Sequence, residues 1–262
     1  FQLLFARFAD EFRFVTWDYR GLFSSGRPVR GYDSLRVDDH AKDALAVIDA
    51  VTSAGDGARD GARAVHALGW SMGVQVLLEA TKLRSNGTSP FASIVLHNGV
   101  PGRPWASVAH GALRRIADRA LAASQKADGF VAAAVRTVAS SSRFVPAAVR
   151  LGLVHHGVDR AVFDDVARSF ADVDMHVYLE ILRRLGEHDG YDALPRIACP
   201  ALVVHGTADW MAPLSVAQRM ARDMPNASLA VLPGGTHYAS AEMPALFHDE
   251  LAKFWRGVGA LA

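Results

Sequence analysis

The chain has 262 residues, half of them apolar, with a formal net charge of +1 at pH 7. Its length allows one sizeable domain with a buried core, and its near-neutral charge with dispersed basic residues argues against a nucleic-acid partner. The one cysteine, Cys199, excludes an intrachain disulfide and fits a small buried thiol better than a nucleophile. No apolar run reaches the length of a membrane span and no signal-peptide pattern is present, so we expect a cytoplasmic protein.

Strands and helices alternate in the first part of the chain. The predicted elements begin with a helix over residues 1–12, a strand over 14–17, and a helix from Asp33 or Ser34 through Ile48 that ends before Gly55 and Gly57. A strand over 64–68, a helix over 74–83 and a strand over 93–97 follow. Such alternation implies right-handed crossovers and a parallel sheet.

A different texture follows between Trp105 and about Asp192, where alanine-, arginine- and leucine-rich helical patterns contain no convincing strand. We interpret this segment as a helical insertion that sits on the sheet. The strand rhythm then resumes, with predicted elements at 201–205 (strand), 213–224 (helix), 229–232 (strand) and 243–255 (helix).

The segment Gly69-Trp70-Ser71-Met72-Gly73 matches G-x-S-x-G and lies between a predicted strand and a predicted helix. That motif lifts a serine hydroxyl above the C-terminal edge of a parallel sheet. We expect the serine backbone to be strained, and side chains in place of the two glycines to collide with the adjoining strand and helix. The alternative is an inert serine that caps the helix.

Two later segments favour the catalytic interpretation of Ser71. Asp209 and His237 each follow the end of a predicted strand, at the rim where parallel sheets place their sites. A weak nucleophile such as serine needs a base to take its proton and a carboxylate to orient that base. Each residue has a plainer explanation alone, since Asp209 could cap a helix and His237 could lie in a surface loop. The order nucleophile, acid, histidine is that of one hydrolase fold.

These motifs resemble those of the α/β-hydrolase family. The likeness covers most of the chain and rests on three stretches: Asp18 to Ser24, similar to the family's D-x-R-G-x-G-x-S loop except that Phe23 replaces a glycine; Ile197 to Asp209, similar to its acid strand; and Gly235-Thr236-His237, similar to its histidine loop. The fold class it implies is α/β, with a mostly parallel sheet and a helical cap. Residues 1–102 and 193–262 would form the core, and 103–192 the cap.

The resemblance implies that Ser71 is the nucleophile, His237 the general acid and base, and Asp209 the residue that orients it. In the family the backbone N–H after the nucleophile, here Met72, forms part of the oxyanion hole with a second N–H from a His-Gly loop after the third strand. No such loop precedes Phe1. We therefore expect the N-terminal strands of the fold to be missing from this chain, as in an incomplete record of a longer protein.

The predicted function is that of a serine hydrolase that cleaves a carboxylic ester or a related acyl compound through an acyl-enzyme, with no cofactor. The same triad serves C–C bond hydrolases, thioesterases, lactonases and cofactor-free haloperoxidases, and a non-catalytic receptor for an apolar ligand is a further alternative. Trp70, Trp210 and Met211 are candidates to line an apolar substrate pocket, although ordinary packing explains them equally well.

Other groups of residues carry weaker signals. His155-His156 lacks a carboxylate or cysteine at ligand spacing, so we expect no metal there. His97 and Asn98 lie where some relatives carry an alternative acid, but Asn98 is no carboxylate. Basic residues outnumber Asp118 and Asp128 in the first half of the cap, namely Arg114, Arg115, Arg119, Lys126, Arg136, Arg143 and Arg150. An acidic acyl carrier protein could dock there, but a solvated arginine face accounts for the charge more simply.

Overall fold

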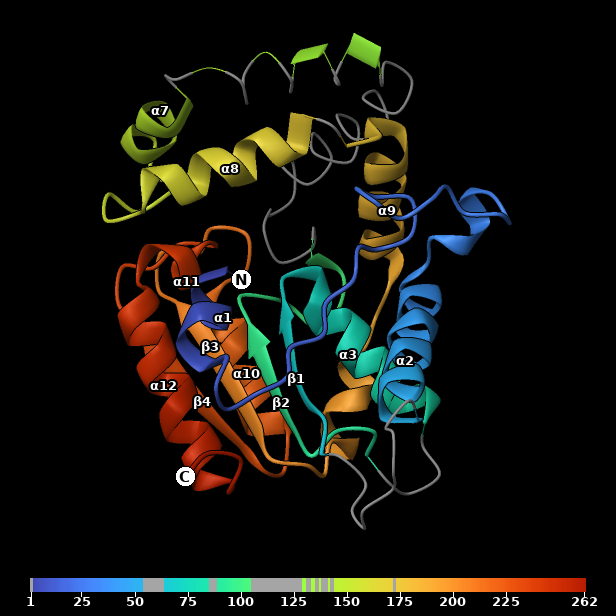
Figure 1. The fold of residues 1–262 in the computed structure, drawn as a ribbon, viewed down its shortest axis with the longest axis vertical. Helices are drawn as coiled ribbons and strands as arrows, with labels where there is room; N and C mark the ends of the chain where they lie inside the picture. Colours follow the sequence, from blue (N-terminus) through green and yellow to red (C-terminus); the bar gives the residue numbers. More distant parts are fainter. Residues whose placement is uncertain are drawn as a thin grey trace.

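The computed structural model describes residues 2–53, 64–84, 89–104, 129–130, 133–134, 137, 141, 144–171 and 173–262. Within them lies a four-stranded sheet in the order β1-β2-β3-β4, with all neighbouring pairs parallel. The strands are β1 (His66–Trp70), β2 (Ser93–His97), β3 (Ala201–Gly206) and β4 (Ala227–Leu232). Their C-terminal ends meet at one rim, as the strand predictions required (Figure 1).

Helices cover both faces of this sheet, because successive side chains of a strand point to opposite sides. Ile94 and Leu96 of β2 pack into a core with α2 (Val37–Ser53), α3 (Met72–Leu83) and α10 (Leu214–Asp223). Val95 between them packs on the opposite face, against α1 (Gln2–Phe8) and α12 (Pro244–Gly257). Both faces of the sheet are therefore buried, which explains why its strands are nearly continuous apolar runs.

Further helices lie toward the C-terminal rim. Figure 1 shows α7 (Phe144–Arg150) and α8 (Arg160–Ala171) above the sheet, with α9 (Met175–Glu187) to one side. The shorter elements are a 3₁₀ helix at Tyr32–Ser34, a second one at Tyr191–Arg196, and α11 (Ala239–Glu242). Much of the expected cap lies outside the described residues, so its boundaries at 103 and 192 stay a prediction. No helix in the described part is long and apolar enough to cross a membrane.

The strand predicted at 14–17 is wrong. Residues 12–19 run as a segment without regular secondary structure, and β1 pairs with β2 on one side only among the residues described. A β-branched and aromatic run becomes a strand only where a neighbouring strand offers backbone groups to pair with. This segment instead contributes side chains: Phe12 and Phe14 pack against the cluster around Phe8 and Trp255.

The other predicted elements are present with shifted ends. The helix expected from Asp33 or Ser34 begins at Val37, because a 3₁₀ turn occupies Tyr32–Ser34 first. The helix expected over residues 1–12 is shorter, at Gln2–Phe8, and β1 is displaced by two residues to His66–Trp70. Phe1, Gly55 and Gly57 lie outside the described residues.

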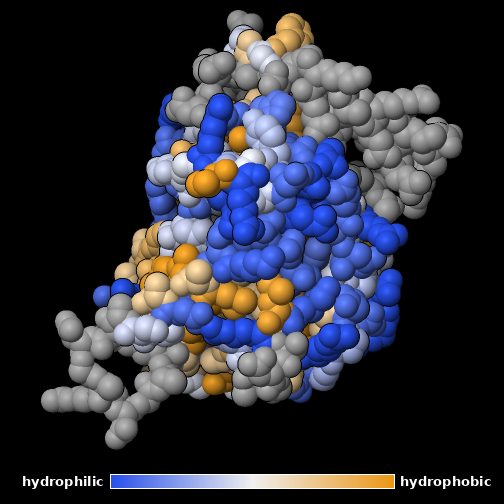
Figure 2. Space-filling model, turned by 90° about the vertical axis from the view of Figure 1, so that its right-hand side faces the viewer, coloured by the Kyte–Doolittle hydropathy of each residue, from blue (hydrophilic) through white to orange (hydrophobic). Residues whose placement is uncertain are grey.

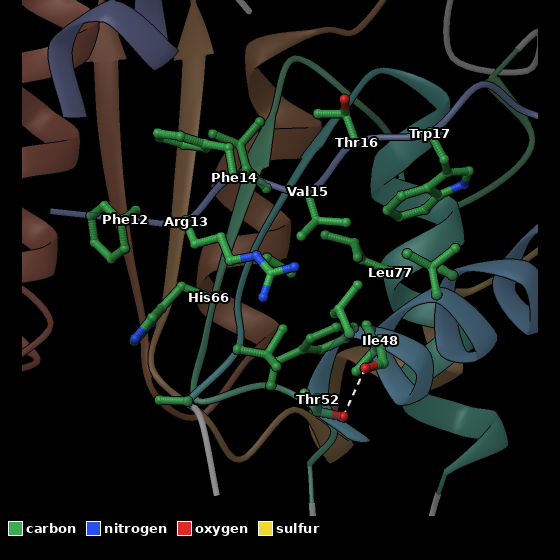
Figure 3. Close-up of a pocket in the computed structure, with 18 of the residues that line it drawn as sticks. Phe12, Arg13, Phe14, Val15, Thr16, Trp17, Ile48, Thr52, His66 and Leu77 are labelled. Carbon is green, nitrogen blue, oxygen red and sulfur yellow. Dashed lines mark hydrogen bonds between the residues drawn. The ribbon is translucent and has the colours of Figure 1, made fainter. Parts of the chain in front are cut away.

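A cavity of about 710 Å³ separates residues 12–17 from β1. Figure 3 shows Phe14, Val15 and Trp17 on one side of it and Ile48 and Leu77 on the other. Apolar surface reaches solvent nearby, since 38% of Val15 and 37% of Trp17 are exposed. On the side of the molecule where α2 lies, hydrophobic residues gather in a band (Figure 2). The cavity is not lined by Ser71, Asp209 or His237.

Candidate active site

Ser71 occupies the sharp turn between β1 and α3. Its backbone dihedrals, φ 55° and ψ −117°, are strained for a residue with a side chain, and its N–H donates to the carbonyl of His97 at 3.0 Å. That bond anchors the turn to the end of the neighbouring strand β2. The Ser71 hydroxyl thus lies at the rim on a backbone that β1 holds before it and α3 holds after it.

The two glycines of the motif differ in importance. A Cβ on Gly69 would lie 2.5 Å from the carbonyl oxygen of Gly73, a distance that real Cβ atoms do not show. A Cβ on Gly73 would meet only the Tyr19 hydroxyl at 3.6 Å, an ordinary contact. The collision is therefore present at Gly69, and its prediction at Gly73 is wrong, because Gly73 lies in the first turn of α3, where an added Cβ would only touch the Tyr19 hydroxyl.

The structure brings the three predicted catalytic side chains together. Ser71 Oγ lies 2.9 Å from His237 Nε2, and His237 Nδ1 lies 2.9 Å from Asp209 Oδ2. The side chain of His237 is 6% exposed and that of Asp209 is fully buried. With a proton on Nδ1, the imidazole donates to the carboxylate and accepts the serine proton on Nε2. This chain of contacts can move a proton from the hydroxyl to the ring.

The second carboxylate oxygen of Asp209 has its own partners. Oδ1 accepts hydrogen bonds from the N–H groups of Met211 at 2.8 Å and Ala212 at 3.0 Å, in the turn that follows β3. These donors fix the carboxylate plane, so that Oδ2 is aimed at the imidazole. They also stabilise negative charge on a carboxylate that water does not reach.

Trp70 supports His237 from the other side. Its indole N–H donates to the His237 carbonyl at 2.9 Å, and its ring lies against the His237 ring with centroids 5.5 Å apart. Because Trp70 directly precedes Ser71, this contact couples the serine turn to the histidine loop. Sequence reasoning offered Trp70 only as a pocket residue, since nothing local to the motif shows what the indole N–H would meet.

Met72 is the first residue of α3. The first N–H groups of a helix have no acceptor within the helix, and they carry the positive end of its dipole. The Met72 N–H therefore has no acceptor within α3, and it belongs to the residue that directly follows Ser71.

Only one of the three residues expected to line a substrate pocket lines a cavity described here. Trp70 lines a cavity of about 310 Å³, together with Phe163 of α8 and Tyr238 of the histidine loop. Trp210, 50% exposed, and Met211 line neither this cavity nor the one beside β1. The walls of the cavity around Trp70 are mostly apolar, and they include the residue before Ser71 and the residue after His237 but neither of those two residues itself.

Two further histidines lie buried at the ends of β2 and β3. Burial lowers the pKa of His97 to about 3 and also lowers the pKa of His205. His97 Nδ1 lies 3.2 Å from the Val204 carbonyl, and His205 Nε2 lies 2.8 Å from the Ala212 carbonyl. Both rings are neutral at pH 7 and can each donate to their carbonyl, so they add no positive charge beside His237.

The weaker sequence signals have these positions. The rings of His155 and His156 are tilted by 41° with centroids 4.0 Å apart, and the described residues contain no group of three or more potential metal ligands. Phe23, at the family's glycine position, keeps a left-handed backbone with φ 48° and an exposed ring. Of the basic residues that argued for a carrier protein, only Arg150 lies within the described part.

Comparison with known proteins shows which family this chain belongs to. The model of the Alpha/beta hydrolase family matches residues 1–252. Among solved structures, a bromoperoxidase from Bacillus anthracis superposes with a TM-score of 0.68 at 17% identity, covering 91% of this chain and 80% of that chain. A thermophilic esterase from Thermogutta terrifontis gives a TM-score of 0.68 at 20% identity, covering 98% of this chain and 84% of that chain.

A curated relative matches over a shorter stretch. The protein named "Putative carbamate hydrolase RutD" from Caulobacter sp. (strain K31) is 34% identical over 79 residues, which is 30% of this chain and 30% of that relative. The solved structures, at these identities, establish the shared fold alone. Since the family model spans residues 1–252, the chain belongs to the alpha/beta hydrolase family.

Proposed function

We propose that this protein is a serine hydrolase that cleaves a carboxylic ester or a related acyl compound through an acyl-enzyme. The observation that carries the proposal is the continuous set of contacts from the Ser71 hydroxyl through His237 to Asp209, each 2.9 Å long. A structural serine at a helix start would not need a buried imidazole and carboxylate aligned behind it.

In the proposed first step, Ser71 Oγ attacks the substrate carbonyl while His237 Nε2 takes its proton. Asp209 holds the ring in the tautomer with a proton on Nδ1 and stabilises the imidazolium as it forms. The Met72 N–H donates to the oxyanion. His237 then gives its proton to the leaving alkoxide, which departs as an alcohol and leaves an ester on Ser71.

The second step removes the acyl group. A water molecule gives its proton to His237 and attacks the acyl-enzyme carbonyl, and the imidazolium returns that proton to Ser71 as the carboxylic acid leaves. No redox agent enters this sequence, and every group that moves a proton is supplied by the described residues.

The apolar cavity of about 310 Å³ beside Trp70, Phe163 and Tyr238 supports an acyl compound with an apolar part. Trp70 is the substrate-binding residue that this cavity favours, while Trp210 and Met211, which line neither of the two cavities described above, stay candidates. Docking of an acidic carrier and the cytoplasmic location also stay predictions.

The decisive experiment combines active-site labelling with hydrolysis of p-nitrophenyl esters of short and long acyl chains. We expect a fluorophosphonate probe to label Ser71, and Ser71→Ala to lower turnover by on the order of 10⁴-fold or more with the fold intact. Ser53→Ala, at an exposed position near the end of α2, is the control and should retain wild-type turnover. Retained activity in Ser71→Ala would contradict the proposal.

The same assay separates the alternatives. Relatives are named as a bromoperoxidase and a carbamate hydrolase as well as esterases, so bromination and carbamate cleavage are measured beside ester cleavage. A non-catalytic receptor would bind an apolar ligand but give neither labelling nor turnover.

A further inference from the structure

The residue before the proposed catalytic histidine is held at each of its polar atoms. The Thr236 N–H donates to Glu242 Oε2 at 2.8 Å, and its hydroxyl donates to Glu242 Oε1 at 2.5 Å. Its carbonyl accepts from the Asn98 side-chain amide at 2.7 Å. Thr236 is only 3% exposed, so water does not compete for these bonds. The peptide planes on both sides of Thr236 are therefore fixed, and one of them leads directly into His237.

Asn98 joins three parts of the rim. It follows β2, is fully buried and has a left-handed backbone with φ 44°, which asparagine tolerates better than most residues. Its amide nitrogen donates to Thr236, while its oxygen accepts from the Gly206 N–H at 2.9 Å, at the end of the strand that leads to Asp209. Asparagine offers both a donor and an acceptor, and both are used here. One side chain thus ties the end of β3 to the histidine loop.

Glu242 holds the other side of Thr236. It lies in α11 and is 4% exposed, and besides the two bonds from Thr236 it accepts the His155 N–H at 2.8 Å. All three partners are donors, so the side chain is used purely as an acceptor, as an ionised carboxylate is. His155 belongs to the segment between α7 and α8. Glu242 therefore links the histidine loop to the helices that lie above the rim.

We propose that Asn98 and Glu242 are positioning residues, which hold the loop of His237 through Thr236 so that Nε2 stays within reach of the Ser71 hydroxyl. The inference rests on the proposed function for its kinetic consequences. Loop residues that leave a strand are mobile unless they are tied down, and a displacement of about 1 Å at a reacting group costs on the order of 100-fold in rate. Neither side chain reaches the contacts between Ser71, His237 and Asp209 itself.

Two nearly isosteric substitutions test the inference. Asn98→Asp keeps the side-chain oxygen that accepts from the Gly206 N–H. It replaces the amide N–H₂ that donates to the Thr236 carbonyl with an oxygen, so two acceptors face each other. Glu242→Gln points an amide N–H₂ at one of the groups that now donate. For each variant we expect kcat for a p-nitrophenyl ester to fall about 10- to 100-fold, with KM changed less than about threefold. Asp249→Asn, at an exposed carboxylate of α12, is the matched control and should keep wild-type constants.

A spectroscopic measurement separates positioning from general destabilisation. The His237 Nδ1 proton, shared with Asp209, should give a low-field imidazole resonance in the proton NMR spectrum of the wild type and of Asp249→Asn. We expect it to shift or broaden in Asn98→Asp and Glu242→Gln below their unfolding temperatures. Wild-type kcat and an unchanged resonance in both variants would overturn the inference.

The test survives two complications. If Glu242→Gln does not fold, Thr236→Val replaces it, because this change removes one of the three hydrogen bonds that Glu242 accepts. A lower kcat at unchanged KM in Thr236→Val and in Asn98→Asp supports the inference. If the wild type is not labelled at Ser71, the proposed function fails, whereas the change in the imidazole resonance still decides whether Asn98 and Glu242 position the ring.

Discussion

Two buried histidines in different regions of the molecule, His237 and His40, have opposite environments. At the C-terminal rim, His237 has a partner at each ring nitrogen, and Thr236 beside it is bonded to Asn98 and Glu242. In α2, His40 is fully buried, neither of its nitrogens has a hydrogen-bond partner among the described residues, and it packs edge-on against Tyr19 with ring centroids 5.0 Å apart. His237 is thus held by directional bonds, whereas His40 is held by its packing against Tyr19.

The largest expected effect comes from breaking the rim. Asp209→Asn retains an acceptor for the N–H groups of Met211 and Ala212 but offers His237 Nδ1 an amide, which favours the wrong tautomer. We expect kcat to fall by on the order of 10⁴-fold with the unfolding temperature nearly unchanged. Steady-state kinetics and calorimetry check this. A loss below about 10-fold would show that the contact at 2.9 Å is not used.

This contrast also explains how far the sequence could predict the structure. Ser71, Asp209 and His237 could be placed because each follows a strand, and parallel strands bring their ends to one rim. Asn98 and Glu242 could not, since their partner Thr236 is far from Asn98 in sequence and only the assembled rim shows the bonds. The sequence does carry a signal for Asn98, its place directly after β2, but from the sequence alone this residue is notable only because it is not a carboxylate.

The second prediction concerns stability at low pH. Burial, together with the charge of Arg20, lowers the pKa of His40 from 6.5 to about 4. Between these two pH values, His40 binds a proton in the unfolded chain but not in the folded protein. Its contribution to the free energy of unfolding is therefore fully present above pH 6.5 and is lost as pH falls toward 4. At about 1.4 kcal/mol per pKa unit, the loss is on the order of 3 kcal/mol.

Substitution isolates this contribution. His40→Leu removes the unpartnered ring, so urea unfolding at about pH 7 and pH 5 should show a smaller difference in the free energy of unfolding than in the wild type. Burial also lowers the pKa of His97, so part of the pH dependence of stability remains in both the wild type and His40→Leu. His156→Leu, at an exposed histidine, is the control and should leave the difference as it is. An equal difference in His40→Leu would mean that the ring finds a partner in solution.

A smaller effect distinguishes the two glycines of the serine turn. Gly69→Ala places a methyl group 2.5 Å from the Gly73 carbonyl oxygen, and we expect a loss of about 1–3 kcal/mol in the free energy of unfolding. Gly73→Ala meets only Tyr19 at 3.6 Å and should change stability by less than about 1 kcal/mol, since alanine favours the helix. Chemical unfolding measures both, and equal losses would contradict the difference in crowding.

The smallest single change is expected at Val15, in the segment Phe14–Trp17 that is not a strand. Val15 is 38% exposed beside the cavity of about 710 Å³, whereas Val95 of β2 is 1% exposed between the two layers of helices. Replacing valine by threonine keeps the shape and β-branching but adds a hydroxyl, which costs about 1–3 kcal/mol where it is buried without a partner. We expect Val95→Thr to lose that amount on chemical unfolding, and Val15→Thr to change stability by less than about 0.5 kcal/mol. Strand propensity is the same at both positions, so the difference measures what a neighbouring strand and two covered faces add. Equal losses would mean that residues 14–17 are packed in solution as tightly as a strand of the sheet.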